Sequence, residues 1–333
     1  MSFARDRSRA LIPLLAATAI LASAASLLFG PAQLSFAAIV DAFCGHGDPI
    51  VRDIILQLRL PRMALALLVG AMLGAGGAAL QGYLRNPLAE PGVLGVSGMA
   101  SLGAIVAIYW KLAESHAWLL PLFAIFGALV ALAPLVALSS RSESPLTLIL
   151  AGVALATLSG AGISLALNLA PNPFAAMEIT TWLLGSLEDR TVHDVWIALP
   201  CIAVGLALML WDGKALDALT LGEDSARALG ADLRRVRLRL LAGIAIGVGG
   251  AVAVSGSIGF VGLIVPHLVR PLTDRSPSAL LVPSALAGAV MLVAADLAVR
   301  LIPTAAPLKL GVLTAFLGVP IFVRHLLKER RLW

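Results

Sequence analysis

The chain has 333 residues, 59% of them hydrophobic and 13% charged, with a mean hydropathy of +0.96 and a formal net charge of +5. A soluble domain carries about a quarter charged residues, so this composition excludes a soluble fold. The two tyrosines give no aromatic platform for nucleic acid, and the two cysteines and five histidines show no metal-ligand spacing. We therefore expect an all-α integral membrane protein that binds neither nucleic acid nor a metal.

Ten apolar segments reach or approach the length of about 20 residues that spans a bilayer as a helix. The eighth segment is too short for a full crossing, and Gly256 and Gly259 before it allow a broken helix there. The ten expected spans are 10–30, 61–83, 93–110, 117–138, 146–169, 192–211, 238–256, 258–269, 279–302 and 308–327.

The first span has a basic start and small residues near 22–25, as a signal peptide has. We expect it to remain in the protein, because its apolar run is long and its loss would leave the other spans without their first partner. Lysines and arginines concentrate in the loops on one side when the N-terminus is placed in the cytoplasm. We therefore expect both termini to be cytoplasmic.

Two stretches of the chain are near-copies of each other, because residues 68–78 recur at 241–251 with a constant offset of 173. One copy lies in a span that runs inward and the other in a span that runs outward. We therefore expect a single membrane domain over 1–333 with inverted repeats, roughly 58–170 and 236–328. Within them, small residues four apart predict close helix packing. These residues are Gly70, Gly74, Gly243 and Gly247.

The largest inner loop, 212–237, has the pattern of two short helices. Gly222 marks the turn between them, and Gly230 is placed where a glycine ends a helix. Acidic residues open the second helix and Arg227 lies late in it, which suits the helix dipole. The loop is either a solvated connector or a docking element for a cytoplasmic partner, and its mixed-charge, amphipathic pattern favours docking.

Four motifs follow one another along the chain: 59–62 (RLPR), 86–97 (NPLAEPGVLGVS), 221–230 (LGEDSARALG) and 256–270 (GSIGFVGLIVPHLVR). In this order they resemble the FecCD family, the permease subunits of type II ABC importers for iron–siderophore complexes, haem and cobalamin. The resemblance runs from about residue 55 to 328, and 86–92 is similar in particular to cobalamin-importing members. Residues 142–147 match a second gate stretch of such members but depart from its pattern.

The resemblance implies a type II importer permease fold with ten helices in the bacterial cytoplasmic membrane. It implies a homodimer, two cytoplasmic ATPase subunits and a periplasmic or lipid-anchored substrate-binding protein. This chain is then no enzyme and binds no cofactor, while ATP and magnesium belong to the ATPase. Consistently, the sequence has no Gly-x-x-x-x-Gly-Lys-Ser/Thr loop for ATP phosphates.

The resemblance also gives the second inner helix a role in coupling to the ATPase. Polar contacts are expected from Glu223, Ser225 and Arg227, and buried contacts from apolar residues beside them. The residues of this coupling segment are Leu221, Gly222, Glu223, Ser225, Ala226, Arg227, Leu229 and Gly230.

By the same resemblance, Arg59, Arg62 and Arg300 pair with acidic residues of the binding protein at the outer side. An arginine fork can bind a carboxylate through two hydrogen bonds. The alternative is that these arginines extend to the membrane interface without a partner.

The segment Asn86, Pro87 and Leu88 is expected to help form the cytoplasmic gate. Pro87 and Pro91 restrict the backbone, so a fixed turn follows from the sequence itself. A purely structural turn is the alternative.

Asp296 is the acidic residue expected deep in a span. It could couple transport to protons, as in an ion-driven secondary transporter, but it lies four residues before Arg300, at helical pairing distance. We expect a structural pair or a hydrogen bond at the helix end. An intramembrane enzyme is disfavoured, because no catalytic constellation is visible in the spans.

The resemblance implies an iron complex of the siderophore or haem class as the expected substrate, because this is the commonest role in the family. Cobalamin is the alternative, because the permeases for all these substrates share the same motifs.

Overall fold

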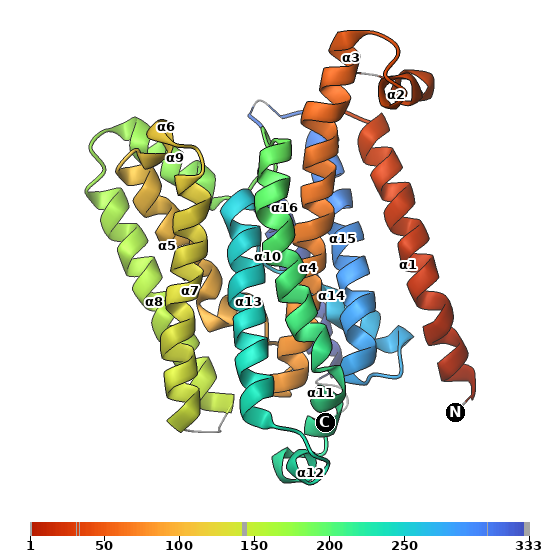
Figure 1. Cartoon of the computed structure of the whole chain (residues 1–333), viewed down its shortest axis with the longest axis vertical. Coiled ribbons are helices and arrows are strands. Elements are labelled where there is room, and N and C mark those ends of the chain that lie inside the picture. The colour runs from red at the N-terminus through yellow and green to blue at the C-terminus, as the bar shows by residue number, and fades with distance from the viewer. Residues whose placement is uncertain (1, 31, 33, 142–144, 305, 330–333) are drawn as a thin grey trace.

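The computed structural model describes the chain except for residues 1, 31, 33, 142–144, 305 and 330–333. In the described residues the regular structure is entirely helical, and the long helices run roughly parallel to one axis (Figure 1). The expected all-α membrane architecture is confirmed.

All ten expected spans are present as helices. Seven are long and apolar enough to cross a membrane, and α5, α14 and the described part of α16 are shorter apolar helices. The helices are α1 (Ser2–Leu28), α4 (Leu60–Leu84), α5 (Val96–Tyr109), α7 (Leu119–Arg141), α8 (Pro145–Asn168), α10 (Val192–Trp211), α13 (Leu233–Ser255), α14 (Val261–Val269), α15 (Pro277–Leu301) and α16 (Leu310–Glu329).

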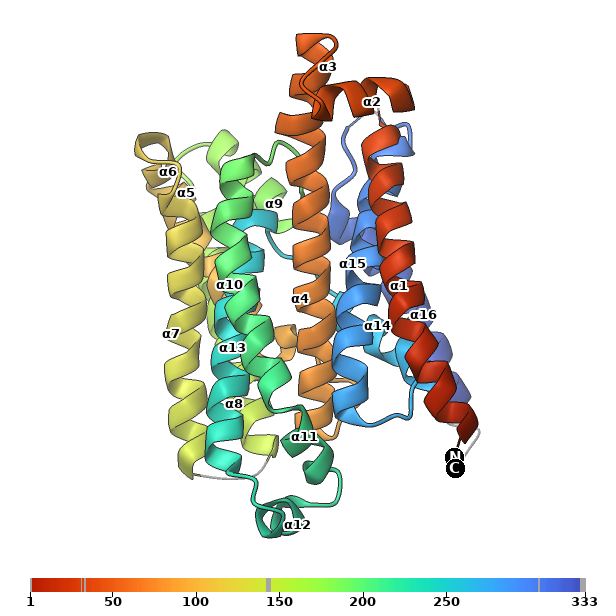
Figure 2. The ribbon, with the colours of Figure 1, turned by 45° about the vertical axis from the view of Figure 1, so that its right-hand side comes forward.

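Short helices lie at the two ends of the bundle (Figure 2). We name the end that carries α12 the inner end and the opposite end the outer end, following the predicted orientation. The outer elements are α2 (Phe36–Phe43), α3 (Pro49–Asp53), η1 (Ile54–Arg59), α6 (Leu112–Ser115) and α9 (Pro173–Leu183); toward the inner side lie η2 (Pro91–Leu94), α11 (Gly213–Leu219), α12 (Glu223–Ala228) and η3 (Arg270–Leu272).

Helices α3, η1 and α4 form one continuous apolar helix of 36 residues. At 1.5 Å per residue it is about 54 Å long, which exceeds the roughly 30 Å of a bilayer core. Its outer part therefore projects beyond the other helices and carries α2 (Figure 1). The middle segment η1 is a π-helix, which accommodates one extra residue per turn.

The eighth span is a broken helix, as the sequence predicts. After α13, Gly256 has a φ of +67° and the chain is irregular until Phe260, which also has a φ of +67°. Only then does α14 begin, and it lies in the inner half of the bundle (Figure 1).

The repeated glycines lie at close helix contacts. Gly70 and Gly74 of α4 face α15, where an added Cβ would collide with the backbone carbonyls of Gly288 and Ser284. Gly243 of α13 faces α10, and Gly247 lies against Met72 of α4 and Gly205 of α10. The two repeat helices α4 and α13 run in opposite directions, since α4 follows the outer α3 and α13 follows the inner α12 (Figure 1).

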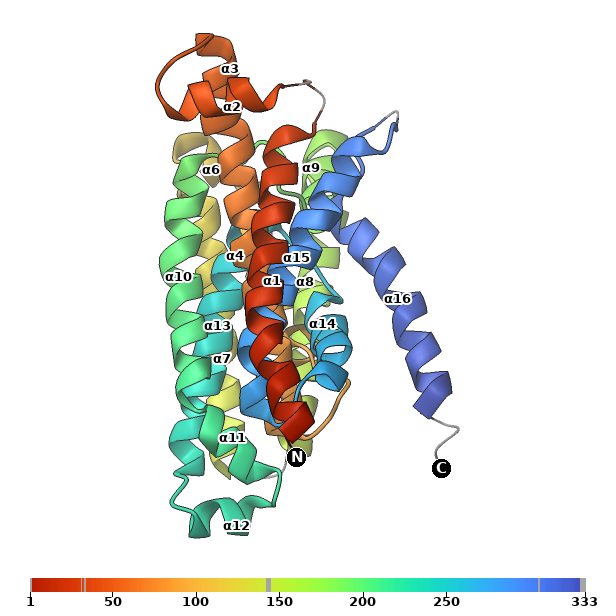
Figure 3. The ribbon, with the colours of Figure 1, turned by 90° about the vertical axis from the view of Figure 1, so that its right-hand side faces the viewer.

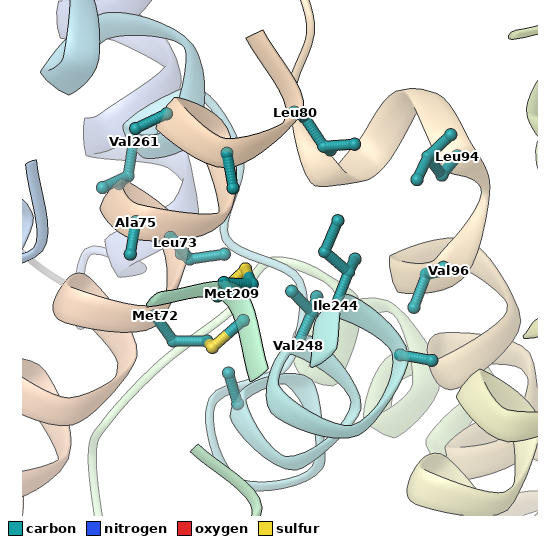
Figure 4. Packing of buried hydrophobic residues seen from close by; sticks show 14 of the residues in the cluster. Met72, Leu73, Ala75, Leu80, Leu94, Val96, Met209, Ile244, Val248 and Val261 are labelled. Atoms are coloured by element: carbon teal, nitrogen blue, oxygen red, sulfur yellow. The ribbon is translucent and has the colours of Figure 1, made fainter. Parts of the chain in front are cut away.

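The main core lies where α4, α10, α13 and α14 meet. Met72 of α4, Met209 of α10 and Val248 of α13 are fully buried and point toward one another (Figure 4). By contrast, α16 diverges from the bundle toward its inner end (Figure 3), and Phe316 on it is 75% exposed.

The glycine contacts yield a stability prediction. Gly70→Ala should lower the free energy of unfolding by about 1–3 kcal/mol, because the new methyl group must push α4 away from the Gly288 backbone. Thermal unfolding of the purified protein in detergent would measure this. Gly160→Ala on α8 is the matched control, because its Cβ would meet no atom within 4 Å. Equal melting temperatures for the two variants would contradict the contact.

Candidate functional site

The predicted inner loop forms α11 and α12, and α12 projects furthest at the inner end (Figure 3). Gly222 precedes α12 with a φ of +101°, and Gly230 follows it with a φ of +88°. The backbone N–H of Gly230 donates to the carbonyl of Arg227, and that of Ala231 to Ala226, at 2.9 and 3.0 Å. This is the hydrogen-bond pattern of a glycine-ended helix. The predicted turn and helix stop are confirmed.

Two leucines flank the projecting helix and are exposed. Leu221 and Leu229 are each 68% exposed, so the tip presents apolar surface. Ala226 between them is fully buried against the protein's own core. An outside partner can therefore reach the two leucines, whereas Ala226 faces inward.

The polar residues of α12 interact within the helix. Arg227 lies 3.1 Å from Asp224 and 3.5 Å from Glu223, and Ser225 is exposed. Exposed pairs of this kind contribute little to stability.

Hydrogen bonds connect helix α11 to the start of α15. The carboxylate of Asp217 accepts the backbone N–H of Ser278 at 2.8 Å and its hydroxyl at 2.5 Å. At the end of α10, Asp212 forms a bidentate pair with Arg239 of α13, at 2.5 and 2.7 Å. Polar contacts therefore connect the inner loop to the spanning helices α13 and α15.

The predicted gate segment forms a tight turn at the inner end of α4. The side-chain oxygen of Asn86 accepts the backbone N–H of Leu88 at 2.9 Å, and the carbonyl of Asn86 accepts that of Ala89 at 3.1 Å. The fixed turn around Pro87 is confirmed, and Leu88 is 42% exposed. Of the second gate stretch, residues 142–144 lie outside the described residues.

After this turn the chain packs into the bundle. Pro91 fits between Gly76 and Gly262, where an added Cβ would lie 3.3 and 3.0 Å from its ring. Glu90 beside it hydrogen-bonds to the backbone of Phe260 at the start of α14. Glu90 belongs to the 86–97 motif, but the sequence spacing could not show that the backbone of Phe260 is its partner.

At the outer end, Asp296 lies between two arginines. Its carboxylate is 1% exposed and accepts from the Nε of Arg62 at 2.8 and 3.1 Å. The Nε of Arg300 lies 3.2 Å away, at the predicted i,i+4 spacing. The expected pair is confirmed, and Arg62 is a second partner that the sequence did not indicate.

Arg59 and Arg300 also donate hydrogen bonds to the C-terminal end of α1. Arg59 donates to the carbonyls of Leu27, Leu28 and Ala32 and is 6% exposed. Arg300 donates to the carbonyl of Ser26 at 3.1 Å and to its hydroxyl at 2.6 Å. Both side chains therefore have structural contacts within the chain.

The three arginines share the wall of one outer cavity of about 330 Å³. Arg190 also lines it, with Glu188 and Asp189 beside it. Burial lowers the pKa of the Arg190 guanidinium, against the effect of nearby Asp194 and Asp189. Among the described residues, no acid lies within ion-pair distance of Arg190, and Arg62 binds its acid through Nε. The cavity thus has guanidinium groups open to an external acid.

The arrangement of helices and motifs agrees with a family comparison. The model of the FecCD transport family matches residues 17–328. This chain belongs to the FecCD transport family.

Relatives of this FecCD chain cover nearly its whole length. It is 38% identical to the vitamin B12 import system permease protein BtuC of Vibrio vulnificus, over 97% of this chain and 95% of the relative. It is 40% identical to the uncharacterized ABC transporter permease protein YvrB of Bacillus subtilis, over 86% and 82%. A solved structure of a metal-chelate type ABC transporter in an inward-facing conformation superposes with a TM-score of 0.87, at 30% identity over 96% and 99%. The chain is therefore a multi-pass ABC transporter permease.

The FecCD motifs do not reveal every polar contact of the sites. Arg237 is buried, and its Nε donates to the hydroxyl of Tyr83 at 2.8 Å. Lys309 pairs with Glu188 at 2.9 Å beside the outer cavity. These residues lie far apart in the sequence, so no spacing rule could have joined them.

The outer cluster yields a second prediction. Asp296→Asn should lower the free energy of unfolding by about 3–5 kcal/mol, because Arg62 and Arg300 then face each other without an anion. Denaturant titration of the purified chain would measure this. Glu114→Gln, which removes an exposed pair with Lys111, is the control and should leave the midpoint unchanged. An Asp296→Asn midpoint equal to that of the control would contradict a structural role.

Proposed function

We propose that this chain is the membrane-spanning subunit of a binding-protein-dependent importer that moves a metal chelate inward and is driven by separate ATPase subunits. The projecting α12, with exposed Leu221 and Leu229, carries this proposal. An apolar tip in the cytoplasm would be unfavourable without a partner that covers it. The chain has no ATP-binding loop of its own, so ATP and magnesium belong to that partner.

In this proposal α12 inserts into the ATPase, and two copies of the chain bind two ATPase subunits. Movement of α12 passes to α11 and, through Asp217 and Ser278, to α15. The turn at Asn86, Pro87 and Leu88 closes the inner side of the path. With α12 in the cytoplasm, α1 begins and α16 ends on the cytoplasmic side (Figure 1).

On the outer side, the substrate-binding protein docks at the arginine-lined cavity. Arg62 and Arg190 provide the donors for its acidic residues, while Arg59 and Arg300 hold the shape of the cavity through their bonds to α1 and the segment after it. Bidentate arginine contacts suit this role, because they fix orientation as well as charge.

An ion-coupled transporter is less well supported by the geometry. Its coupling group would be Asp296, and that carboxylate is held between two guanidinium groups. Both oxygens of this carboxylate contact guanidinium groups and the residue is 1% exposed, so a transported ion could reach it only if these ion pairs were broken.

For the substrate, we propose a corrinoid of the vitamin B12 class. The support is similarity over nearly the full length to permeases named for vitamin B12 import. An iron complex, placed first from the sequence, remains the second candidate because the similar solved structure is of the metal-chelate type.

Replacing the exposed leucines tests the coupling role. Leu221→Asp with Leu229→Asp should abolish uptake by cells and co-purification of the ATPase, because two charges cannot enter an apolar cleft without a large desolvation cost. Membrane insertion should be unchanged, and Leu221→Met with Leu229→Met, which keeps an apolar tip, should retain uptake. Uptake that survives the aspartate substitutions, or active accumulation by vesicles containing this subunit alone, would refute the coupling model.

The substrate class has a separate test. The cognate binding protein, identified by co-purification, should bind cyanocobalamin in isothermal titration and deliver it in uptake assays with the complete transporter. Ferric siderophores and haem are the comparison ligands in the same titration. Binding of an iron complex with no response to cyanocobalamin would replace the corrinoid with the second candidate.

A further inference from the structure

A cavity of about 260 Å³ at the inner end is lined by three arginines from different segments. Arg85 ends α4, Arg270 begins η3, and Arg275 lies in the loop before α15. Thr220, just before α12, also lines it, since α11 packs against both α4 and α15 (Figure 2). None of the described residues that line this inner arginine cavity is acidic.

Arg270 is held in place by a buried glutamine. Its guanidinium donates to the side-chain oxygen of Gln81 at 2.9 Å, and Gln81 is 3% exposed. The amide nitrogen of Gln81 in turn lies 3.4 Å from the carbonyls of Gly262 and Leu263 in α14. The position of Arg270 is therefore fixed before any ligand arrives, which reduces the entropic cost of binding.

Arg85 and Arg275 have left-handed backbone conformations and exposed side chains. Arg85 has a φ of +49° and Arg275 a φ of +68°, in the left-handed region that non-glycine residues rarely adopt. Within the described part of the chain, neither guanidinium has an ion pair or a hydrogen bond. Asp274, next to Arg275 in the sequence, accepts hydrogen bonds from the backbone N–H and the hydroxyl of Ser276 and does not line the cavity.

Arginines at the inner end of a membrane protein often only extend toward the lipid surface. These three instead converge from three segments on one concavity. Like charges gathered in this way repel one another, so a multivalent anion between them would be strongly favoured. A phosphate offers more acceptor oxygens than a carboxylate, and arginine forks match its geometry.

We propose that the inner arginine cavity binds a phosphate group, either free inorganic phosphate or the phosphate of an anionic lipid headgroup. The bound group bridges Arg85 beside the gate turn, Arg270 at the end of α14, and Arg275 before α15. It thereby connects the gate turn to α14 and α15, beside Thr220 and the coupling segment. This site does not depend on the proposed transport substrate.

Binding of radiolabelled orthophosphate to the full-length chain in phosphatidylcholine nanodiscs tests the site. Binding should be saturable, and Arg85→Gln and Arg275→Gln should each raise the Kd about tenfold, as expected for the loss of one charged hydrogen bond. Arg234→Gln, an exposed inner-end arginine outside the cavity, is the matched control and should leave the Kd unchanged. Equal melting temperatures of the variants would show that each is folded.

A second arm distinguishes the two sources of phosphate. In nanodiscs with equal amounts of phosphatidylcholine and phosphatidylglycerol, unchanged orthophosphate binding would identify the free ion as the ligand. Loss of binding there would identify the lipid headgroup as the competing occupant, and either result supports the site. Absence of saturable binding in phosphatidylcholine, or a Kd unaffected by both cavity substitutions, would overturn the proposal. Neither of these two overturning results would contradict the proposed transport function.

Discussion

The contact of α4 with α15 is made between backbones, and the functional parts at both ends depend on it. At Gly70, Gly74 and Gly288 there is no side chain that could adapt if the helices slid. Packed backbones of this kind move together as a unit. Helix α4 carries the outer Arg62 and the inner gate turn, while α15 carries Asp296 and the contact to α11. In the proposed mechanism, a movement at the inner end would therefore reach the outer arginines through this rigid pair of helices.

Buried charge is used differently at the two ends of the bundle. At the outer end, the single negative charge of Asp296 lies between Arg62 and Arg300, and backbone carbonyls accept hydrogen bonds from Arg59. Buried ionic contacts of this kind specify geometry more than they add stability. At the inner end the arginine cavity has no comparable acid among its described lining residues. The outer cluster therefore contains its own acid, whereas the proposed phosphate site at the inner end would take its anion from outside the chain.

The sequence predicted the architecture well, because long apolar segments in lipid have few alternatives to spanning helices. It also predicted local features, such as the end of α12 at Gly230 and the pairing of Asp296 with Arg300, since helix geometry fixes both. It did not predict that Arg62 shares Asp296, because the two residues are 234 positions apart. Nor did it predict that Ala226 faces the core, because an amphipathic pattern does not say which neighbour covers which face. Contacts between distant segments require the packed structure.

The π-helical turn η1 separates the outer cap from the membrane-embedded part of α4. A π turn is equivalent to one inserted residue in an α-helix. Deleting one residue here would restore α-helical winding without rotating α2 and α3 around the axis of α4, because the wider turn already accommodates the extra residue. The glycine contacts below would keep their register. Arg59 is the last residue of η1, so the hydrogen bonds that it donates to the end of α1 would be the contacts disturbed by the loss of a single codon here.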